Sequence, residues 1–226
     1  MPVAPKRATP VTASVNREAV ARYDMADRAD FADADRGLIA GLPERKLLHA
    51  DGQLMFDFGK LDYITDRAQA PDTVNPSLWR QSQVMRRGGL YQVTDGLYQV
   101  RNNDIASLTI IEGDSGLVII DCTASVEAAA QGMELFRAQV SDKPVVAVIY
   151  THTHIDHYGG VKGVVDVADV ASGKVPIIAP ARPEPDRTDH LRHRRGQPAW
   201  PHGFLHLAHR RHHPDRRHPR TRRADV

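Results

Sequence analysis

The chain has 226 residues, 41% of them hydrophobic, and its formal net charge at pH 7 is +2. This length allows one well-packed core, or one domain with appendages. No apolar stretch approaches the roughly 18–20 residues of a membrane span, and the N-terminus lacks the continuous apolar segment of a secretory signal. We therefore expect a cytoplasmic protein without a membrane span, with the periplasm as the alternative.

The near-neutral charge hides an asymmetry between the two ends of the chain. Residues 181–226 contain twelve of the 24 arginines, eight of the 12 histidines and no lysine. Before residue 181 the only histidines are His49, which we expect in a solvated loop, and three within residues 152–157. The last 46 residues therefore form a compositional region of their own.

The first 70 residues predict an N-terminal arm followed by short helices. Residues 1–15 are mostly Pro, Ala, Val, Thr and Ser, which offer little to bury and favour a loose arm. Residues 16–43 are rich in Ala, Asp and Arg, a composition that favours short helices ending at Gly41 and Pro43.

The next segments have weaker patterns. Residues 52–64 are apolar without a clean period. Residues 69–81 resemble a loop, because Pro71 and Pro76 interrupt them, with Trp79 as an anchor.

Two β-hairpins are predicted between residues 89 and 121. The first covers residues 89–101 with a turn at 94–96, and the second covers residues 105–121 with a turn at 113–116. Cys122 follows the second hairpin and is the only cysteine, which excludes an intramolecular disulfide. We expect it to be a small buried hydrophobic side chain.

A helix and a buried strand complete the predicted α/β layer architecture. Residues 125–140 have a helical period with a broad apolar face, and Ser125 is a suitable N-cap. Residues 143–150 are continuously apolar, as in a strand that is buried on both faces. We expect residues 71–180 to form this α/β domain.

The sequence YTHTHIDHYGG at the end of that strand predicts a metal site. It places His152, His154, Asp156 and His157 within six positions. In an extended segment side chains two residues apart point the same way, so the first two histidines can reach one cation together. The two following glycines let the backbone turn and bring the other two side chains to the same point. Imidazole nitrogen and carboxylate oxygen suit zinc, and less often manganese or iron.

The pattern H-x-H-x-D-H after an apolar strand resembles the metal-binding signature of the metallo-β-lactamase superfamily. The stretches PDTVNPSLWRQ, GLYQVTDGLYQVR, IEGDSGLVIID and VVAVIYTHTHIDHYGGVKGV resemble its alkylsulfatase branch, the enzymes that hydrolyse dodecyl sulfate and similar esters. The resemblance covers roughly residues 16–180.

This resemblance implies an αββα sandwich, present here as its N-terminal half, with two zinc ions at one edge. His152 and His154 would bind the first ion, and Asp156 and His157 the second. Asp156 is also the candidate catalytic residue, and Asp121 would support the site structurally. The two ions would share a water, lower its pKa to about 7 and so generate the hydroxide that hydrolyses an alkyl sulfate to alcohol and sulfate.

The resemblance stops at about residue 180. The family's further metal ligands, its dimerisation region and its C-terminal lipid-carrier-like domain have no counterpart in residues 181–226. We therefore expect a truncated enzyme with impaired activity, and do not carry over the homodimer of complete members. Half a sandwich would expose an apolar face, which predicts low stability.

Residues 181–226 are expected to be a disordered basic tail. The favoured interpretation is a GC-rich coding region read in the wrong frame, which yields Arg, His and Pro but almost no Lys. The alternatives are a His-rich metal-binding tract and a nucleic-acid-binding extension. Nucleic acid is not the expected partner, because Trp200 and Phe204 are too few for a stacking platform.

Two alternatives for function stay open. The chain could derive from another metallo-β-lactamase-type hydrolase, acting on a lactam, a thioester or a phosphoester. It could also be a non-catalytic fragment that binds metal or nucleic acid through its basic tail.

Overall fold

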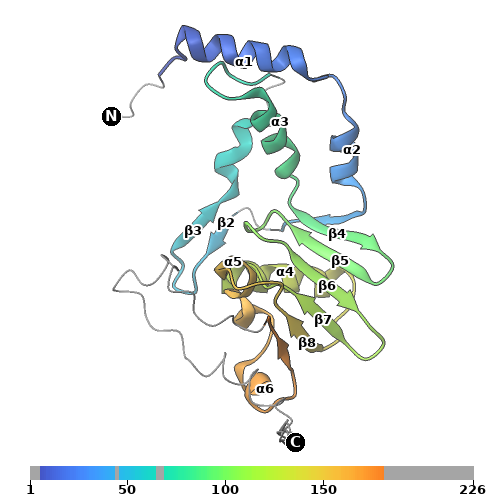
Figure 1. The fold of residues 1–226 in the computed structure, drawn as a ribbon. Coiled ribbons are helices and arrows are strands. Elements are labelled where there is room, and N and C mark those ends of the chain that lie inside the picture. Colours follow the sequence, from blue (N-terminus) through green and yellow to red (C-terminus); the bar gives the residue numbers. More distant parts are fainter. Residues whose placement is uncertain (1–5, 44–45, 65–68, 181–226) are drawn as a thin grey trace, which may run out of the picture.

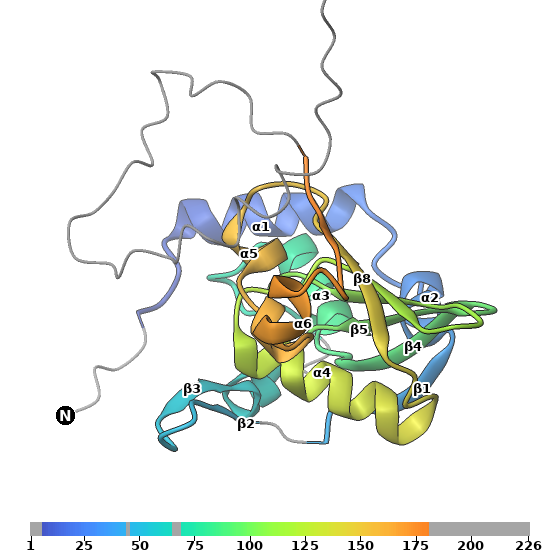
Figure 2. The ribbon, with the colours of Figure 1, turned by 90° about the horizontal axis from the view of Figure 1, so that it is seen from below.

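The computed structural model describes residues 6–43, 46–64 and 69–180. Its centre is a seven-stranded sheet of order β1-β4-β5-β6-β7-β8-β9, and β2 pairs with β3 in a separate two-stranded sheet (Figure 1). Helix α4 (Val126–Gln139) lies along one face of the large sheet (Figure 2). This arrangement confirms the predicted α/β class.

The large sheet is antiparallel from β1 to β7 and parallel from β7 to β9. Parallel neighbours need a crossover connection, and α4 supplies it between β7 and β8. Its strands are β1 (Leu38–Gly41), β4 (Gly89–Thr94), β5 (Leu97–Arg101), β6 (Leu108–Glu112), β7 (Leu117–Ile120), β8 (Val145–Ile149) and β9 (Ile177–Ile178).

The two predicted hairpins and the predicted helix are confirmed. Strands β4 and β5 form the first hairpin, and β6 and β7 the second. The Ser125 hydroxyl accepts a hydrogen bond from the Ala128 N–H at 3.2 Å, so it caps α4 as expected.

The predicted N-terminal arm is wrong for residues 10–15, which lie in helix α1 (Pro10–Arg22). The Thr9 hydroxyl accepts from the Thr12 N–H at 3.1 Å, and Pro10 occupies the first helical turn, where its missing N–H costs nothing. Helix α2 (Ala29–Asp35) follows, in agreement with the expected short helices. The expected helix end at Gly41 is wrong, because Leu38–Gly41 form strand β1, which pairs with β4.

The predicted loop over residues 69–81 is wrong from Pro76 onward. Helix α3 (Pro76–Met85) begins there, because the Asn75 side chain accepts from the N–H groups of Ser77 and Leu78. The proline opens the helix instead of interrupting it. Trp79 is an anchor as predicted, with 5% of its surface exposed.

The remaining elements are short. No helix of the described residues is long and apolar enough to cross a membrane. The expected basic tail, residues 181–226, lies outside the described residues. The short elements are β2 (Lys46–Leu48), β3 (Leu54–Asp57), η1 (Phe58–Ile64), α5 (Ile155–Tyr158), η2 (Val161–Gly163) and α6 (Val167–Ala171).

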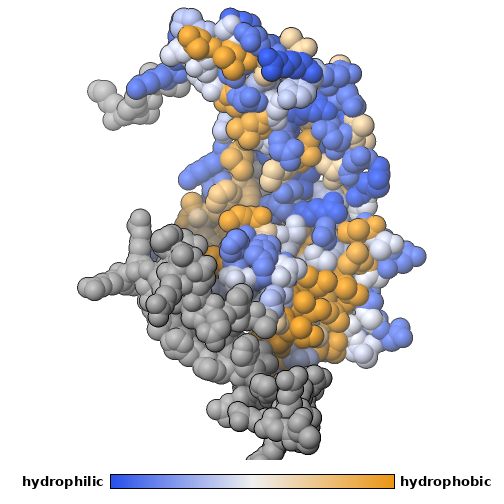
Figure 3. Space-filling view, in the orientation of Figure 1, coloured by the Kyte–Doolittle hydropathy of each residue, from blue (hydrophilic) through white to orange (hydrophobic). Residues whose placement is uncertain are grey.

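The expectation that residues 143–150 form a strand buried on both faces is wrong. In β8 only Val148 is fully buried, and the other four residues are partly exposed. The reason is that α4 covers one face of the sheet, while the opposite face carries partly exposed apolar side chains over β5–β8 (Figure 3). An open apolar face is what the half-sandwich interpretation predicts.

Candidate metal centre

The predicted metal ligands lie where two parallel strands end. Strand β7 leads into Asp121 and β8 leads into Thr151, and the Asp121 N–H donates to the Ile149 carbonyl at 2.9 Å. Because parallel strands end at the same edge of a sheet, these two exits are neighbours. The side chains that follow β8 therefore meet Asp121 at this edge.

The segment after β7, which we call the support loop (residues 121–125), has an unusual backbone. Asp121 and Thr123 have positive φ angles of 58° and 60°, in the left-handed region that non-glycine residues rarely adopt. Cys122 donates its N–H to the His157 carbonyl at 2.8 Å, and Gly160 donates to the Thr123 carbonyl at 3.0 Å. Such strain persists only where the surroundings hold it, and it is concentrated at functional sites.

The two glycines after the histidine motif allow a close approach. A Cβ on Gly159 would overlap the Ala124 carbonyl oxygen, and a Cβ on Gly160 would overlap the Cys122 carbonyl oxygen. The predicted turn is realised as helix α5, whose C-terminal end packs on the support loop through these glycines.

Asp121 fixes the orientation of His157. Its Oδ2 lies 2.7 Å from His157 Nδ1, and the residue is buried, with 8% of its surface exposed. A carboxylate can only accept, so Nδ1 carries a proton and donates it to Asp121. This hydrogen bond is the kind that orients a metal-binding histidine.

Thr151 orients His152 in a similar way. The Thr151 N–H donates to Asp121 Oδ1 at 2.8 Å, and its hydroxyl donates to Asp121 Oδ2 at 2.8 Å. Because the single hydroxyl proton is used there, the oxygen accepts from His152 Nδ1, which lies 2.9 Å away. His152 therefore also has a proton on Nδ1.

The four predicted ligand residues gather in one place. The ring centroids of His152 and His154 are 4.7 Å apart, and those of His152 and His157 are 3.9 Å apart. Asp156 Oδ2 lies 3.3 Å from His157 Nε2. Within residues 6–43, 46–64 and 69–180, no three His, Cys, Asp or Glu side chains converge in a metal-binding arrangement. Imidazole nitrogen and carboxylate oxygen are donors that zinc binds. In this structure, however, the histidine rings contact one another and do not surround a common point.

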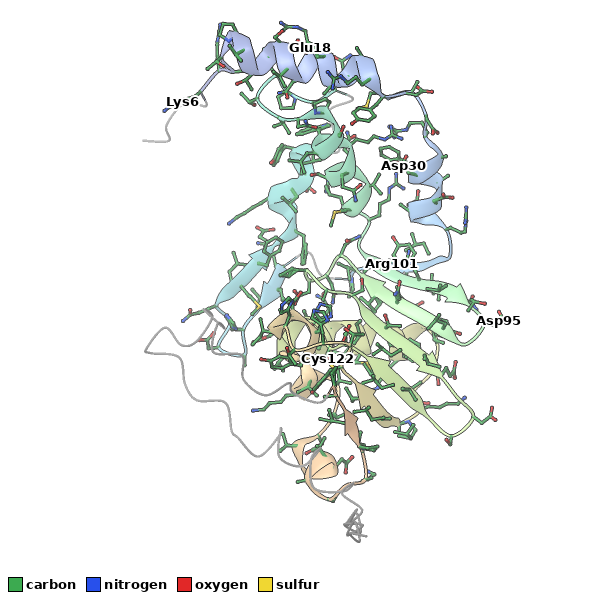
Figure 4. All side chains as sticks on the ribbon, in the orientation of Figure 1. Lys6, Glu18, Asp30, Asp95, Arg101 and Cys122 are labelled. Carbon is green, nitrogen blue, oxygen red and sulfur yellow. The ribbon has the colours of Figure 1, made fainter. Side chains whose placement is uncertain are left out.

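Cys122 is buried beside this edge of the sheet (Figure 4). Burial, and secondarily the Asp121 charge, raises the pKa of its thiol to about 12. The thiol is therefore protonated at neutral pH, whereas a metal ligand would be a thiolate. This confirms the prediction of a small buried hydrophobic side chain.

Two long-range contacts around the site and α4 were not predicted from the sequence. His49 is exposed in a loop, as predicted, and its Nδ1 also lies 2.9 Å from Glu127 Oε1 at the start of α4. Asp104, between β5 and β6, accepts from the Ala124 N–H of the support loop at 3.1 Å. Both contacts join residues far apart in the chain, and no local pattern marks them.

A family profile and similar known proteins point to the same family. The profile of the metallo-beta-lactamase superfamily matches residues 101–222. A linear primary-alkylsulfatase of Pseudomonas sp is 47% identical over 175 residues, which are 77% of this chain and 26% of that protein. Alkyl/aryl-sulfatase BDS1 of Saccharomyces cerevisiae is 44% identical over 175 residues, 77% of this chain and 27% of that protein.

A solved structure shares the fold of the described part. The stereoselective inverting sec-alkylsulfatase Pisa1 from Pseudomonas sp. superposes with a TM-score of 0.71 and 46% sequence identity, over 76% of this chain and 27% of that one. This chain thus spans about a quarter of the length of these relatives.

The profile match continues past Pro180 into the Arg- and His-rich segment, which lies outside the described residues. The predicted break near residue 180 therefore stays a prediction. Since the profile covers more than half of the chain and includes the whole histidine motif, the chain belongs to the metallo-beta-lactamase superfamily.

Proposed function

We propose that this chain carries the N-terminal, metal-binding part of a zinc-dependent hydrolase that cleaves alkyl sulfate esters to alcohol and sulfate. The observation that carries the proposal is a series of contacts that starts at the buried Asp121, whose carboxylate accepts from His157 Nδ1. The His157 ring contacts the His152 ring, His154 lies against His152, and Asp156 lies against His157. The substrate class is supported by the relatives named alkylsulfatases, at 44–47% identity.

The proposed zinc ligands are His152, His154, Asp156 and His157. Members of the superfamily typically bind zinc, and nitrogen and oxygen donors of this kind suit it. The division implied by the family, with the first two residues on one ion and the last two on a second, is part of this proposal. Four donors are too few for two tetrahedral ions, so we expect impaired hydrolysis by this chain.

Zinc, when bound, supplies a Lewis acid that makes water more acidic and offsets negative charge on the sulfate group. The residues of the chain hold the protons that prepare the site. Asp121 keeps a proton on His157 Nδ1, and the Thr151 hydroxyl keeps one on His152 Nδ1, which leaves the Nε2 atoms as the donors for zinc. Asp156, the proposed catalytic residue, lies beside His157 and supplies a carboxylate that can accept a proton from water.

The proposal is tested by measuring zinc uptake by the full chain and by two histidine variants. We expect His154→Ala to lose affinity by more than the about 10–100-fold typical of residues that only orient a ligand. His49→Ala, which removes a histidine outside the motif, should leave the affinity unchanged. Zinc bound by the eight histidines of residues 181–226 is the same in all three proteins, so the difference isolates the motif.

Activity is tested by sulfate release from dodecyl sulfate, with and without a chelator. We expect slow release that the chelator abolishes and that His154→Ala lacks. Equal zinc affinity in His154→Ala and wild type, or release that persists with chelator, would contradict the proposal. Zinc uptake without any sulfate release would favour another hydrolase of the superfamily.

A further inference from the structure

The connection between β5 and β6 contacts three separate parts of the molecule through three consecutive side chains. Asn102 Nδ2 donates to the Arg87 carbonyl at 3.3 Å. Asn103 is 1% exposed, and its Nδ2 donates to the Ala128 carbonyl in the first turn of α4 at 2.9 Å. Asp104 reaches the support loop. This connection therefore holds α4 and the support loop together from beneath the site.

Asp104 makes the contacts that bear on the metal centre. Its Oδ2 accepts from the Ala124 N–H at 3.1 Å and from the Ser125 hydroxyl at 3.4 Å. Its Oδ1 accepts from the Ile105 N–H at 2.6 Å, which fixes the carboxylate in place. Ala124 directly follows Thr123, one of the two residues of the support loop with a positive φ angle. The carboxylate thus ties down the strained backbone at the point where it leaves the left-handed conformation.

The support loop in turn positions the histidines. It begins at Asp121, whose Oδ2 accepts from His157 Nδ1 and from the Thr151 hydroxyl. If the loop relaxed, Asp121 would leave its left-handed conformation, and its carboxylate would move away from both partners. The proton positions on the two rings would then no longer be determined.

We propose that Asp104 is a positioning residue of the metal centre. It holds the support loop in the conformation in which the Asp121 carboxylate accepts from His157 Nδ1 and from the Thr151 hydroxyl, which itself accepts from His152 Nδ1. The consequence for zinc affinity rests on the proposed function, whereas the consequence for the histidine tautomers does not.

A purely structural role as a helix cap does not account for these contacts. Ser125 already caps α4, since its oxygen accepts from the Ala128 N–H at 3.2 Å. The Ala124 N–H lies outside the helix, and its contact with Asp104 serves the loop alone. Asp166 offers a matched control, because its Oδ1 caps α6 by accepting from the Ala168 N–H at 2.7 Å, away from the support loop.

The first test follows the ring nitrogens of ¹⁵N-histidine-labelled full-length protein by long-range proton–nitrogen NMR at mildly alkaline pH. Signals are assigned with His152→Gln and His157→Gln. In the wild type we expect His152 and His157 each as a single Nδ1–H tautomer. In Asp104→Ala both should become mixtures of the two tautomers, and Asp166→Ala should match the wild type.

Asp104→Asn serves if the alanine variant does not fold. It has nearly the same size and keeps one acceptor oxygen, but places an amide where the carboxylate accepts, so a partial shift to mixed tautomers is expected. Unchanged tautomers in a folded Asp104 variant would overturn the inference. So would a wild type without the Nδ1–H form, or an equal change in the matching Asp166 variant.

Zinc affinity gives the second readout. By competition with a chromogenic chelator, the Asp104 variants should bind zinc about 10–100-fold more weakly, and the Asp166 variants as tightly as wild type. A chain that hydrolyses no alkyl sulfate but shows the tautomer change would refute the proposed substrate while supporting the role of Asp104. If the chain hydrolyses alkyl sulfate but the tautomers do not change in the Asp104 variants, the proposed function is supported and the role of Asp104 is refuted.

Discussion

Both faces of the seven-stranded sheet carry apolar side chains, but these side chains differ in burial. The face under α4 is closed, and seven of its strand residues are 0% exposed: Leu90, Val100, Leu108, Ile110, Leu117, Ile119 and Val148. The opposite face also carries apolar side chains, but they are partly exposed: Leu97, Ile111, Val118, Ile120, Ala147, Ile149 and Ile178. The apolar composition of a strand therefore does not show whether another layer covers it.

Strand register makes the open face continuous. Residues paired across the strands form two apolar rows, Leu97–Ile111–Val118–Ala147 and Ile120–Ile149–Ile178. Figure 3 shows this side of the molecule, with hydrophobic side chains gathered over β5–β8. A sheet that is apolar on both faces is suited to two covering layers, and the described residues supply one.

Adjacent residues of β6 allow the sharpest test of this comparison. Ile110 points to the closed face and is 0% exposed, whereas Ile111 points to the open face and is 38% exposed. Ile110→Ala should lower the free energy of unfolding by about 2–5 kcal/mol, because it leaves a cavity. Ile111→Ala should cost about 1 kcal/mol or less, since its side chain is partly hydrated in the folded state.

The measurement is urea unfolding of wild type and both variants under the same conditions. A loss in Ile111→Ala as large as that in Ile110→Ala would show that the second face is covered in solution, and the comparison would fail.

Local sequence patterns predicted the part of the fold that local chemistry decides. Both hairpins were found because their turns, at residues 94–96 and 113–116, have the glycine and aspartate that tight turns need. The start of α4 was found because Ser125 is a good N-cap. Pro76 was misinterpreted because proline both ends and opens helices, and Asn75 decides the matter through a side-chain contact.

The candidate site was half visible in the sequence. The ligand residues lie within six positions, so their chemistry could be recognised without the fold. Asp104 and His49 act on residues 20 and 78 positions away, and only the folded sheet brings them there. The burial of β8 was mispredicted for a related reason, since a continuous apolar strand reports its composition and not the presence of a second layer.

Self-association provides a second way to probe the open face. We expect the wild type to associate as its concentration rises, because an uncovered apolar face is stabilised by contact with another copy. Ile111→Lys should weaken this association by about tenfold, which corresponds to about 1.4 kcal/mol, since it places a charge in the middle of a row. Val11→Lys in α1 is the control, because Val11 is 73% exposed and lies outside the rows.

Sedimentation velocity over a range of protein concentrations measures the effect. A wild type that stays monomeric throughout, or a Val11→Lys variant that dissociates as much as Ile111→Lys, would remove the open face as the cause.

The smallest expected effect on stability concerns the contact between His49 and helix α4, which covers the closed face. His49 follows β2 and contacts Glu127 in the first turn of α4, so the β2–β3 hairpin touches the helix that covers the sheet. Both side chains are partly exposed, at 45% and 26%, and such pairs contribute about 0–1 kcal/mol. We therefore expect His49→Gln to lower the free energy of unfolding by about 0.5 kcal/mol, with faster amide hydrogen exchange in the first turn of α4. Lys174→Gln, which breaks the exposed pair with Asp169, should match it in stability without changing exchange in α4. A loss above about 2 kcal/mol in His49→Gln would mean that the hairpin belongs to the core, because a surface contact cannot account for so large an effect.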